Sequence, residues 1–268
     1  MSMRQRPEHF TLDYSLPLAR GLVFAGLGGS PGSVCYKDSS GHRNDGILTS
    51  MTPSTDWVWI PELRRCGLEF AGGSQRVILP NVSLFVFNTF DFSISIWYSL
   101  FDGGDSYSAA IGCGATGENE WMLRVRDFVW FYGDGGAINT NIAGLTKYEW
   151  NCVTIVRKNE ILFMYVNSII VNQDNTALHD IASTKAITIG GCGTDRNMAG
   201  QIADVMIYRR AISSNEIQEL ANPSNIMLSN MIKPPKRKLY AIRNTAYSRH
   251  YFVLNSGLGT PSVLRLTS

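Results

Sequence analysis

Strict alternation of apolar and short polar side chains is the feature that most constrains this chain. Residues 90–97 read Phe-Asp-Phe-Ser-Ile-Ser-Ile-Trp, so that an apolar side chain recurs at every second position. Successive side chains of a β-strand point to opposite faces, so this period of two predicts a strand with one face on a hydrophobic core. The segment therefore belongs to a layered β structure with a buried interior.

Several further segments have the length and composition of strands. They are short and apolar, and turn formers such as Asp-Gly-Gly, Lys-Asn and Asn-Ser separate them. These predicted strands lie at residues 121–125, 128–132, 152–156, 161–166, 169–172, 186–189 and 202–208. Many short strands at close spacing predict an all-β protein in which two antiparallel sheets pack as a sandwich.

One short helix is predicted after these strands, over residues 214–221. Ser213 can cap its amino terminus, and Glu216 stands three residues later as the partner in a capping box. Ile212 and Ile217 have the spacing of a hydrophobic staple.

The charge of the chain is divided between two parts. Residues 231–268 hold seven basic residues and no acidic one, whereas 17 basic and 22 acidic residues precede them. We therefore expect an N-terminal arm over residues 1–17, a main domain over 18–228 and a basic C-terminal extension over 229–268. Short strands are expected in the extension at residues 239–242, 251–254 and 263–266.

Five segments occur in an order typical of one domain family. They are residues 38–46 (Asp-Ser-Ser-Gly-His-Arg-Asn-Asp-Gly), 67–72, 92–97, 150–167 and 200–213. Together they resemble the laminin-G-like jelly roll of the concanavalin A-like domains, except that Ala71 stands where an Asp is common and Ser168 replaces a Gly. The resemblance implies a two-sheet antiparallel jelly-roll sandwich with one short helix, followed here by the basic, β-rich extension.

A second resemblance concerns the origin of such domains. Residues 13–23 look like the start of laminin-G-like proteins encoded by tailed phages, in which a basic, proline-containing segment also follows the jelly roll. The polar first nine residues contain no apolar signal segment, and no stretch reaches the roughly 20 apolar residues of a membrane span. We therefore expect a virion protein that is made in the host cytoplasm, without a secretion signal and without a membrane partner.

A calcium site is implied by the first resemblance, since in that family the Asp-Ser-Ser-Gly loop and the closing acidic strand often meet around a structural Ca²⁺. Carried over by position, Asp38 and Asp204 are the candidate carboxylate ligands, and Asn44 and Asp45 are lesser candidates. The alternative is that Asp38 closes its loop as an Asx turn and Asp204 pairs with a nearby arginine, neither of which needs a metal.

Aromatic side chains are the candidates for stacking on a sugar ring. Most of them alternate within predicted strands, where they are expected in the core. Trp57 and Trp59 lie between Pro53 and Pro61 in an expected loop, so we predict that this pair is exposed and binds the ligand.

Catalytic motifs are not recognised in the sequence. The four histidines are scattered and lie in neither a metalloprotease motif nor a nucleophile elbow. Glu118 and Glu120 form an acidic pair, but nothing in the sequence supplies the cleft that glycoside hydrolysis requires. The prediction is a protein that is not an enzyme.

The basic extension is the candidate anchor, through Lys233, Lys236, Arg237 and Lys238. No recognisable nucleic-acid module surrounds these residues, so nucleic acid is not the expected partner. The extension is too small to bury a core of its own and should pack on the sandwich or on a neighbour, which predicts a homo-oligomer or contacts with other virion or assembly proteins.

Two functions remain open on this evidence. The first is a virion-associated structural, decoration or fibre protein whose jelly roll binds glycan or protein surfaces and whose basic tail anchors it to the particle. The second is a carbohydrate- or protein-binding lectin-like module of cellular origin that acts on its own.

Overall fold

A computed structural model gives the fold of the chain. It describes residues 12–27, 29, 31–80, 83–103, 108–113, 121–125, 129–133, 136–139, 146–175, 185–192, 196–224 and 231, and the backbone of residues 239–243, 250–254 and 262–265. The chain divides into two compact units, Met1–Ile232 and Lys233–Ser268. Met231 is fully buried in the first unit, and its carbonyl accepts a hydrogen bond from the Asp13 backbone nitrogen at 2.8 Å. The first unit therefore continues past the boundary expected at residue 228.

The first sheet of the sandwich has eight antiparallel strands. Their order is β14-β13-β12-β7-β16-β5-β4, and β1 pairs with β16. The strands are β1 (Leu22–Gly26), β4 (Trp57–Ile60), β5 (Arg65–Ala71), β7 (Phe92–Leu100), β12 (Asn151–Lys158), β13 (Ile161–Val166), β14 (Ile169–Asp174) and β16 (Ala199–Tyr208).

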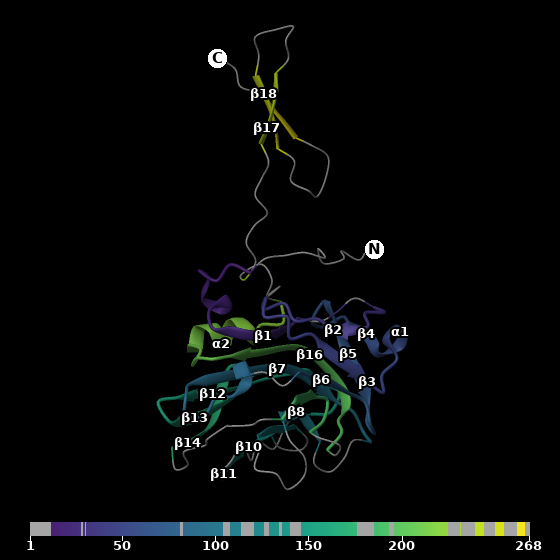
Figure 1. The fold of residues 1–268 in the computed structure, drawn as a ribbon, viewed down its shortest axis with the longest axis vertical. Helices are drawn as coiled ribbons and strands as arrows, with labels where there is room; N and C mark the ends of the chain where they lie inside the picture. The colour runs from purple at the N-terminus through teal and green to yellow at the C-terminus, as the bar shows by residue number, and fades with distance from the viewer. Residues whose placement is uncertain are drawn as a thin grey trace. The chain divides into compact units, whose positions relative to one another are not determined.

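The second sheet also has eight antiparallel strands and lies across the core from the first (Figure 1). Its order is β11-β10-β9-β8-β15-β6-β3-β2. The strands are β2 (Cys35–Tyr36), β3 (Gly46–Thr49), β6 (Arg76–Leu79), β8 (Ala109–Cys113), β9 (Met122–Val125), β10 (Val129–Gly133), β11 (Gly136–Asn139) and β15 (Ile187–Ile189). The predicted all-β sandwich of two antiparallel sheets is thus confirmed.

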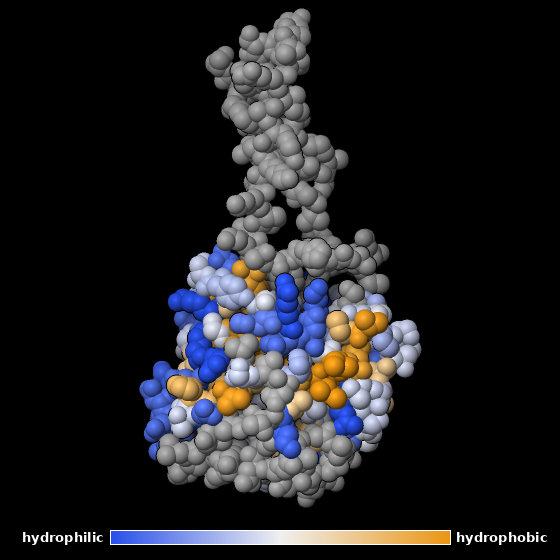
Figure 2. Space-filling view, in the orientation of Figure 1, coloured by the Kyte–Doolittle hydropathy of each residue, from blue (hydrophilic) through white to orange (hydrophobic). Residues whose placement is uncertain are grey.

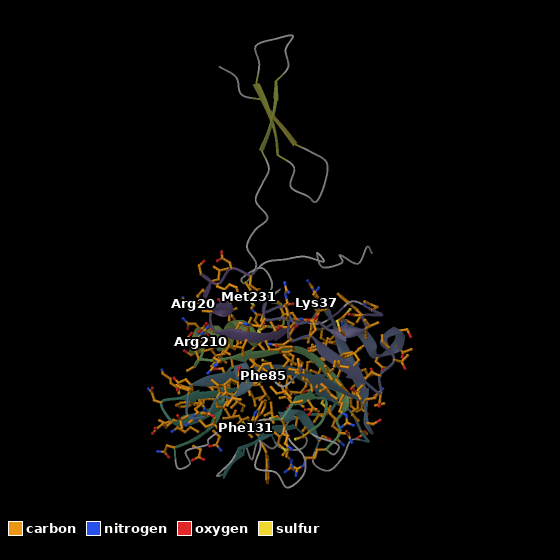
Figure 3. The ribbon with its side chains drawn as sticks, in the orientation of Figure 1. Arg20, Lys37, Phe85, Phe131, Arg210 and Met231 are labelled. Carbon is orange, nitrogen blue, oxygen red and sulfur yellow. The ribbon has the colours of Figure 1, made fainter. Side chains whose placement is uncertain are left out.

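The main core lies between the two sheets and contains the alternating apolar residues of β7. Phe92, Ile94 and Ile96 are fully buried there, together with Phe85 and Phe131, which Figure 3 labels in the interior. Burial of such side chains is worth about 2 kcal/mol each, so this layer dominates the stability of the fold.

A second apolar cluster covers the opposite face of the first sheet, which is why β7 is buried along its whole length. Trp97 belongs to this cluster and donates a hydrogen bond from Nε1 to the Leu220 carbonyl at 2.9 Å. Between the apolar residues, Ser95 Oγ lies 3.0 Å from Thr154 Oγ1, so the buried hydroxyls satisfy one another. The sheet therefore has no solvent-facing side along β7, although its sequence alternates.

The helices are short and lie outside the sheets. They are the 3-10 turns η1 (Pro17–Ala19) and η2 (Ser83–Phe85) and the α-helices α1 (Pro53–Asp56) and α2 (Ser214–Leu220). The capping box of α2 is confirmed, because Ser213 Oγ accepts from Glu216 N and Ser213 N donates to the Glu216 carboxylate at 2.8 Å. Ile212 and Ile217 are both buried in the second cluster.

The second unit contains a three-stranded antiparallel sheet. Its strands, in the order β17-β18-β19, are β17 (Leu239–Arg243), β18 (His250–Leu254) and β19 (Ser262–Arg265). The three strands expected in the extension are therefore present. The four predicted anchoring residues, Lys233, Lys236, Arg237 and Lys238, lie outside the described residues. Across the described part of the chain, no helix has the length and hydrophobicity to cross a membrane.

Candidate ligand-binding surface

The loop over residues 38–46 is built around the carboxylate of Asp38. Its Oδ1 accepts hydrogen bonds from Ala25 N at 3.0 Å and from Ser40 N at 2.8 Å. Its Oδ2 accepts from Ser40 Oγ and from Asn44 N, both at 2.9 Å. The bond to the backbone two residues further on is an Asx turn, so Asp38 organises the loop with both oxygens occupied by protein donors.

Neighbouring polar groups hold the same loop in place. Asn44 donates from Nδ2 to the Val23 carbonyl at 3.2 Å, and Asp45 Oδ1 accepts from Asp38 N at 2.8 Å. Tyr14 donates from its hydroxyl to the Ser40 carbonyl, and partial burial, with Asp38 close by, raises the pKa of Tyr14. The loop thus joins β1 to the segment that precedes η1.

Asp204 is fully buried in β16 and faces a guanidinium. It lies where the register of β16 against β7 shifts, and its φ of 44° is rare for a residue other than glycine. Arg65 Nη1 donates to Asp204 Oδ2 in a buried ion pair. Arg65 also donates to the Leu63 carbonyl at 2.8 Å and to the Pro223 carbonyl at 3.2 Å, so its position is fixed by three segments.

The described geometry gives Asp38 and Asp204 partners within the protein. Ca²⁺ requires about six to eight oxygen atoms directed at it. Both oxygens of Asp38 accept hydrogen bonds from the protein, and Asp204 Oδ2 pairs with Arg65, whereas the buried Asp204 Oδ1 has no hydrogen-bond partner among the described residues. Within the described residues, no group of three or more His, Cys, Asp and Glu side chains could hold a metal ion. The contacts are those of the metal-free alternative, an Asx turn at Asp38 and an arginine pair at Asp204.

Trp57 and Trp59 lie in strand β4, so the prediction of a loop there is wrong. Trp57 is buried and not exposed as expected, because its Nε1 donates to the Ser33 carbonyl at 2.8 Å and its ring stacks on Tyr36. The ring centroids are 5.8 Å apart with an interplanar angle of 24°. Since β4 ends the first sheet and β2 ends the second, this stack closes the sandwich at one edge.

Trp59 is 51% exposed on the same strand, and it is the one tryptophan of the described residues that is classed as exposed. Its strand β4 is the last in the order of the first sheet, so among the described strands β4 pairs with β5 alone. Val34 and Ile47, at the edge of the second sheet, are 79% and 63% exposed. We call these three residues, which lie on or next to β2, β3 and β4 at the ends of the two sheets, the β2–β4 edge. Figure 2 shows apolar surface in the region where Figure 1 labels β3, β5 and β6.

Polar groups adjoin the β2–β4 edge at the helix α1, which contacts β4. Asp56 of this helix accepts a hydrogen bond from Gln75 Nε2 at 3.1 Å. Thr52 and Thr55 lie at its start, and Thr55 is exposed. Both oxygens of Asp56 accept hydrogen bonds within the protein, so the exposed indole of Trp59 is the feature of this surface that offers a sugar a stacking face.

Sequence reasoning missed Arg65 and the two aliphatic residues of the β2–β4 edge. Arg65 pairs with a carboxylate 139 positions later, and no local pattern signals such a partner. Ile47 precedes Leu48, which packs on the core, so the alternation in this short strand was a usable signal for an outward-facing isoleucine. Glu118 and Glu120 lie outside the described residues.

Comparison with known families gives one match. A family model for laminin-G-like domains of the concanavalin A-like lectin/glucanases superfamily matches residues 71–218. A search of curated protein sequences gave no match.

Solved structures of similar fold include a toxin domain, an enzyme-associated domain and a sialidase. The binding domain of Paraclostridial mosquitocidal protein 1 has a TM-score of 0.60 and 16% identity, over 88% of this chain and 64% of that one. Domain 4 of the extracellular arabinanase AbnA from Geobacillus stearothermophilus, in complex with arabinotriose, has a TM-score of 0.59 and 13% identity, over 75% and 98%. Trypanosoma rangeli sialidase has a TM-score of 0.58 and 17% identity, over 77% of this chain and 34% of the sialidase. At these identities the likeness shows the fold.

Proposed function

Because the chain belongs to the concanavalin A-like lectin/glucanases superfamily, we propose that it is a non-enzymatic, lectin-like binding protein and that its β2–β4 edge binds a glycan. The observation that carries the proposal is the exposure of Trp59 at an open edge of the sandwich. A tryptophan held on a strand loses little conformational freedom when it binds, and its flat apolar face suits the C–H face of a sugar ring.

The similar structures support a binding role for this chain but do not identify its ligand. One is described as the binding domain of a toxin, and another is an arabinanase domain solved with arabinotriose. The match covers 98% of the arabinanase domain but 34% of the sialidase chain. The structure that is matched over nearly its whole length is therefore a single domain of a larger protein. The position of the glycan on the β2–β4 edge rests on the exposed tryptophan.

The proposal is tested by screening the full chain on a panel of immobilised neutral and acidic glycans. The variant Trp59→Ala removes the stacking face, and Phe90→Ala removes a phenylalanine that is 61% exposed outside the β2–β4 edge. We expect about tenfold or greater weakening for Trp59→Ala, by analogy with a flat base stacked on an aromatic side chain, which is worth about 1–3 kcal/mol. Unchanged binding in Trp59→Ala, or equal loss in both variants, would contradict the site.

The second unit supports a further part of the proposal, namely that the protein is anchored to a virion or another multi-protein assembly. The unit has three strands, of which β17 and β19 each pair with one strand within the described residues. Open strand edges can pair with another chain, and residues 231–268 carry seven basic residues and no acidic one. The basic residues suit attachment to an acidic partner, and the open strand edges suit pairing with a strand of another protein or of a second copy of this chain.

Light scattering of the full chain and of a chain that ends at Ile232 tests the anchoring proposal. We expect a larger oligomer, or co-assembly with a partner, for the full chain and a monomer for the shortened chain. Identical monomers in both cases would favour the alternative, a lectin-like module that acts on its own. Glycan binding is measured on both chains, so that loss of assembly and loss of binding are told apart.

A further inference from the structure

A separate cavity of about 420 Å³ lies where η1, the end of β12 and the start of α2 meet. Its charged lining residues are Arg20, Lys158, Arg210 and Glu216. Pro17 and Ile212 contribute apolar surface. None of these residues belongs to the β2–β4 edge.

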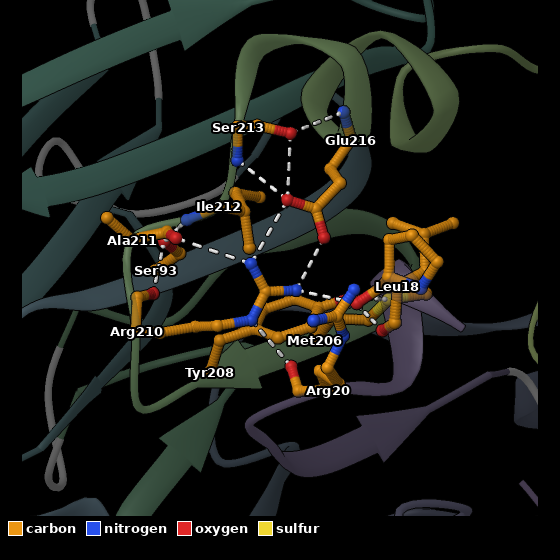
Figure 4. A network of polar contacts seen from close by, with 11 residues as sticks. Leu18, Arg20, Ser93, Met206, Tyr208, Arg210, Ala211, Ile212, Ser213 and Glu216 are labelled. Atoms are coloured by element: carbon orange, nitrogen blue, oxygen red, sulfur yellow. Dashed lines mark hydrogen bonds and ion pairs between the residues drawn. The ribbon is translucent and has the colours of Figure 1, made fainter. Parts of the chain in front are cut away.

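Arg210 has all its donors engaged in the wall of the cavity (Figure 4). Its Nε donates to the Arg20 carbonyl at 2.7 Å, and one Nη donates to the Pro17 carbonyl at 2.7 Å. Both Nη atoms contact the carboxylate of Glu216, at 2.5 and 3.0 Å, and Nη1 also reaches the Ala211 carbonyl at 3.3 Å. The guanidinium is therefore a fixed structural part of the wall.

Glu216 is ionised in this network, and the guanidinium of Arg210 balances its charge. Burial opposes its ionisation, but hydrogen bonds from Arg210 and from the backbone and side chain of Ser213 outweigh burial, so its pKa lies below the ordinary value. The Arg210–Glu216 pair thus adds no net charge to the cavity.

Arg20 and Lys158 supply the remaining charge. Both side chains are exposed, and within the described residues neither has an acidic partner. Two acids lie near Lys158, Glu160 in the same turn and Asp91, which accepts from the Asn159 backbone at 2.9 Å, and neither lines the cavity. Among the residues that line the cavity, two positive charges therefore exceed the neutral Arg210–Glu216 pair.

We propose that this cavity binds the carboxylate or sulfate group of an acidic saccharide. Two cations that converge on a concave surface attract an oxyanion more strongly than isolated surface charges do, because the protein wall excludes part of the screening solvent. The volume lies within the range of ligand pockets, about 300–1,000 Å³, and exceeds what a sulfate alone would fill. The sugar ring that carries the anion accounts for the rest, against Pro17 and Ile212.

Calorimetric titration of the full chain with glucuronic acid, glucose and inorganic sulfate tests this inference. We expect binding of glucuronic acid that weakens as salt is added, and no binding of glucose. Arg20→Gln and Lys158→Gln should each weaken binding about tenfold, and the double variant should abolish it. Lys37→Gln is the matched control, because Lys37 is exposed, does not line the cavity and is labelled apart from Arg20 in Figure 3.

The inference rests on the proposed saccharide function for the nature of its ligand, and the two can fail separately. Binding that Trp59→Ala leaves intact and Arg20→Gln weakens places the anion in this cavity. If the protein bound sulfate but not glucuronic acid, the cavity would be a general oxyanion pocket, and the inference of a saccharide ligand would be overturned. Equal loss in Lys37→Gln would show a non-specific charge effect and overturn the site.

Discussion

Replacement of Asp204 by asparagine should strongly destabilise the sandwich. The side chains of Arg65 and Asp204 are 7% and 1% exposed, so the asparagine variant leaves a guanidinium buried without its counter-ion. Removal of one partner of a buried ion pair costs about 3–5 kcal/mol. Arg65 keeps the Leu63 and Pro223 carbonyls as acceptors, which places the expected loss at the lower end, about 3 kcal/mol.

Urea denaturation followed by tryptophan fluorescence gives the free energy of unfolding of the variant and the parent. For a unit of this size the expected loss corresponds to a fall in melting temperature of about 6–12 °C. The double variant Arg65→Met/Asp204→Asn removes the stranded charge and should recover much of the loss. Asp102→Asn is the control, because its ion pair with Lys147 has side chains that are 68% and 44% exposed, and no measurable change is expected there.

The reasoning would be refuted if Asp204→Asn were as stable as the parent, or if the double variant were less stable than either single one. The same series, measured with Ca²⁺ and with a chelator, also tests the calcium expectation. If Asp204 is neutralised by Arg65, the melting temperature should not depend on Ca²⁺. If instead a chelator lowered the melting temperature of the parent, and Arg65→Met left the stability unchanged, Asp204 would be assigned to a metal.

Two further predictions concern other parts of the first unit. Because the pKa of Glu216 is lowered in the fold, its ionised form stabilises the protein above about pH 4.5, its ordinary pKa, and this stabilisation is lost as the pH falls. Glu216→Gln should therefore have a smaller free energy of unfolding than the parent at pH 7. In urea titrations at acid pH the two free energies of unfolding should become equal. Gly190→Ala should cost about 3 kcal/mol in the same assay, because φ is 83° and a Cβ would lie 2.3 Å from the ring of Phe70, whereas Gly73→Ala, with φ of 65° and open space, should cost about 1 kcal/mol.

Most of the fold could be predicted from the sequence because its signals are local. The alternation at residues 90–97 and the turn formers between short apolar runs gave strands that the structure contains, with ends that differ by a few residues. The capping box of α2 was also predicted, since Ser213 and Glu216 act within one helical turn. The buried second face of β7 was not predicted, because the cover comes from residues more than 100 positions away, such as Leu220.

The candidate site was predicted less well, because exposure depends on which strand ends a sheet. By sequence alone, Trp57 and Trp59 were an equivalent pair between two prolines. In the structure Trp57 is 4% exposed under Tyr36, and Trp59 is 51% exposed beyond it. The difference arises because β4 pairs with β5 in the first sheet, while Tyr36 of β2 in the second sheet stacks on Trp57.

The sequence by itself determined the layered all-β architecture, the capped helix and the division into an acidic body and a basic extension, since period, spacing and charge are read along the chain. Only the tertiary structure decided that Asp204 pairs with Arg65, that Asp38 accepts a hydrogen bond from the β1 backbone at Ala25, and that Arg20 and Lys158 line the same cavity. These contacts join residues that are far apart in sequence, and their energies depend on distance and burial, which the order of residues does not contain.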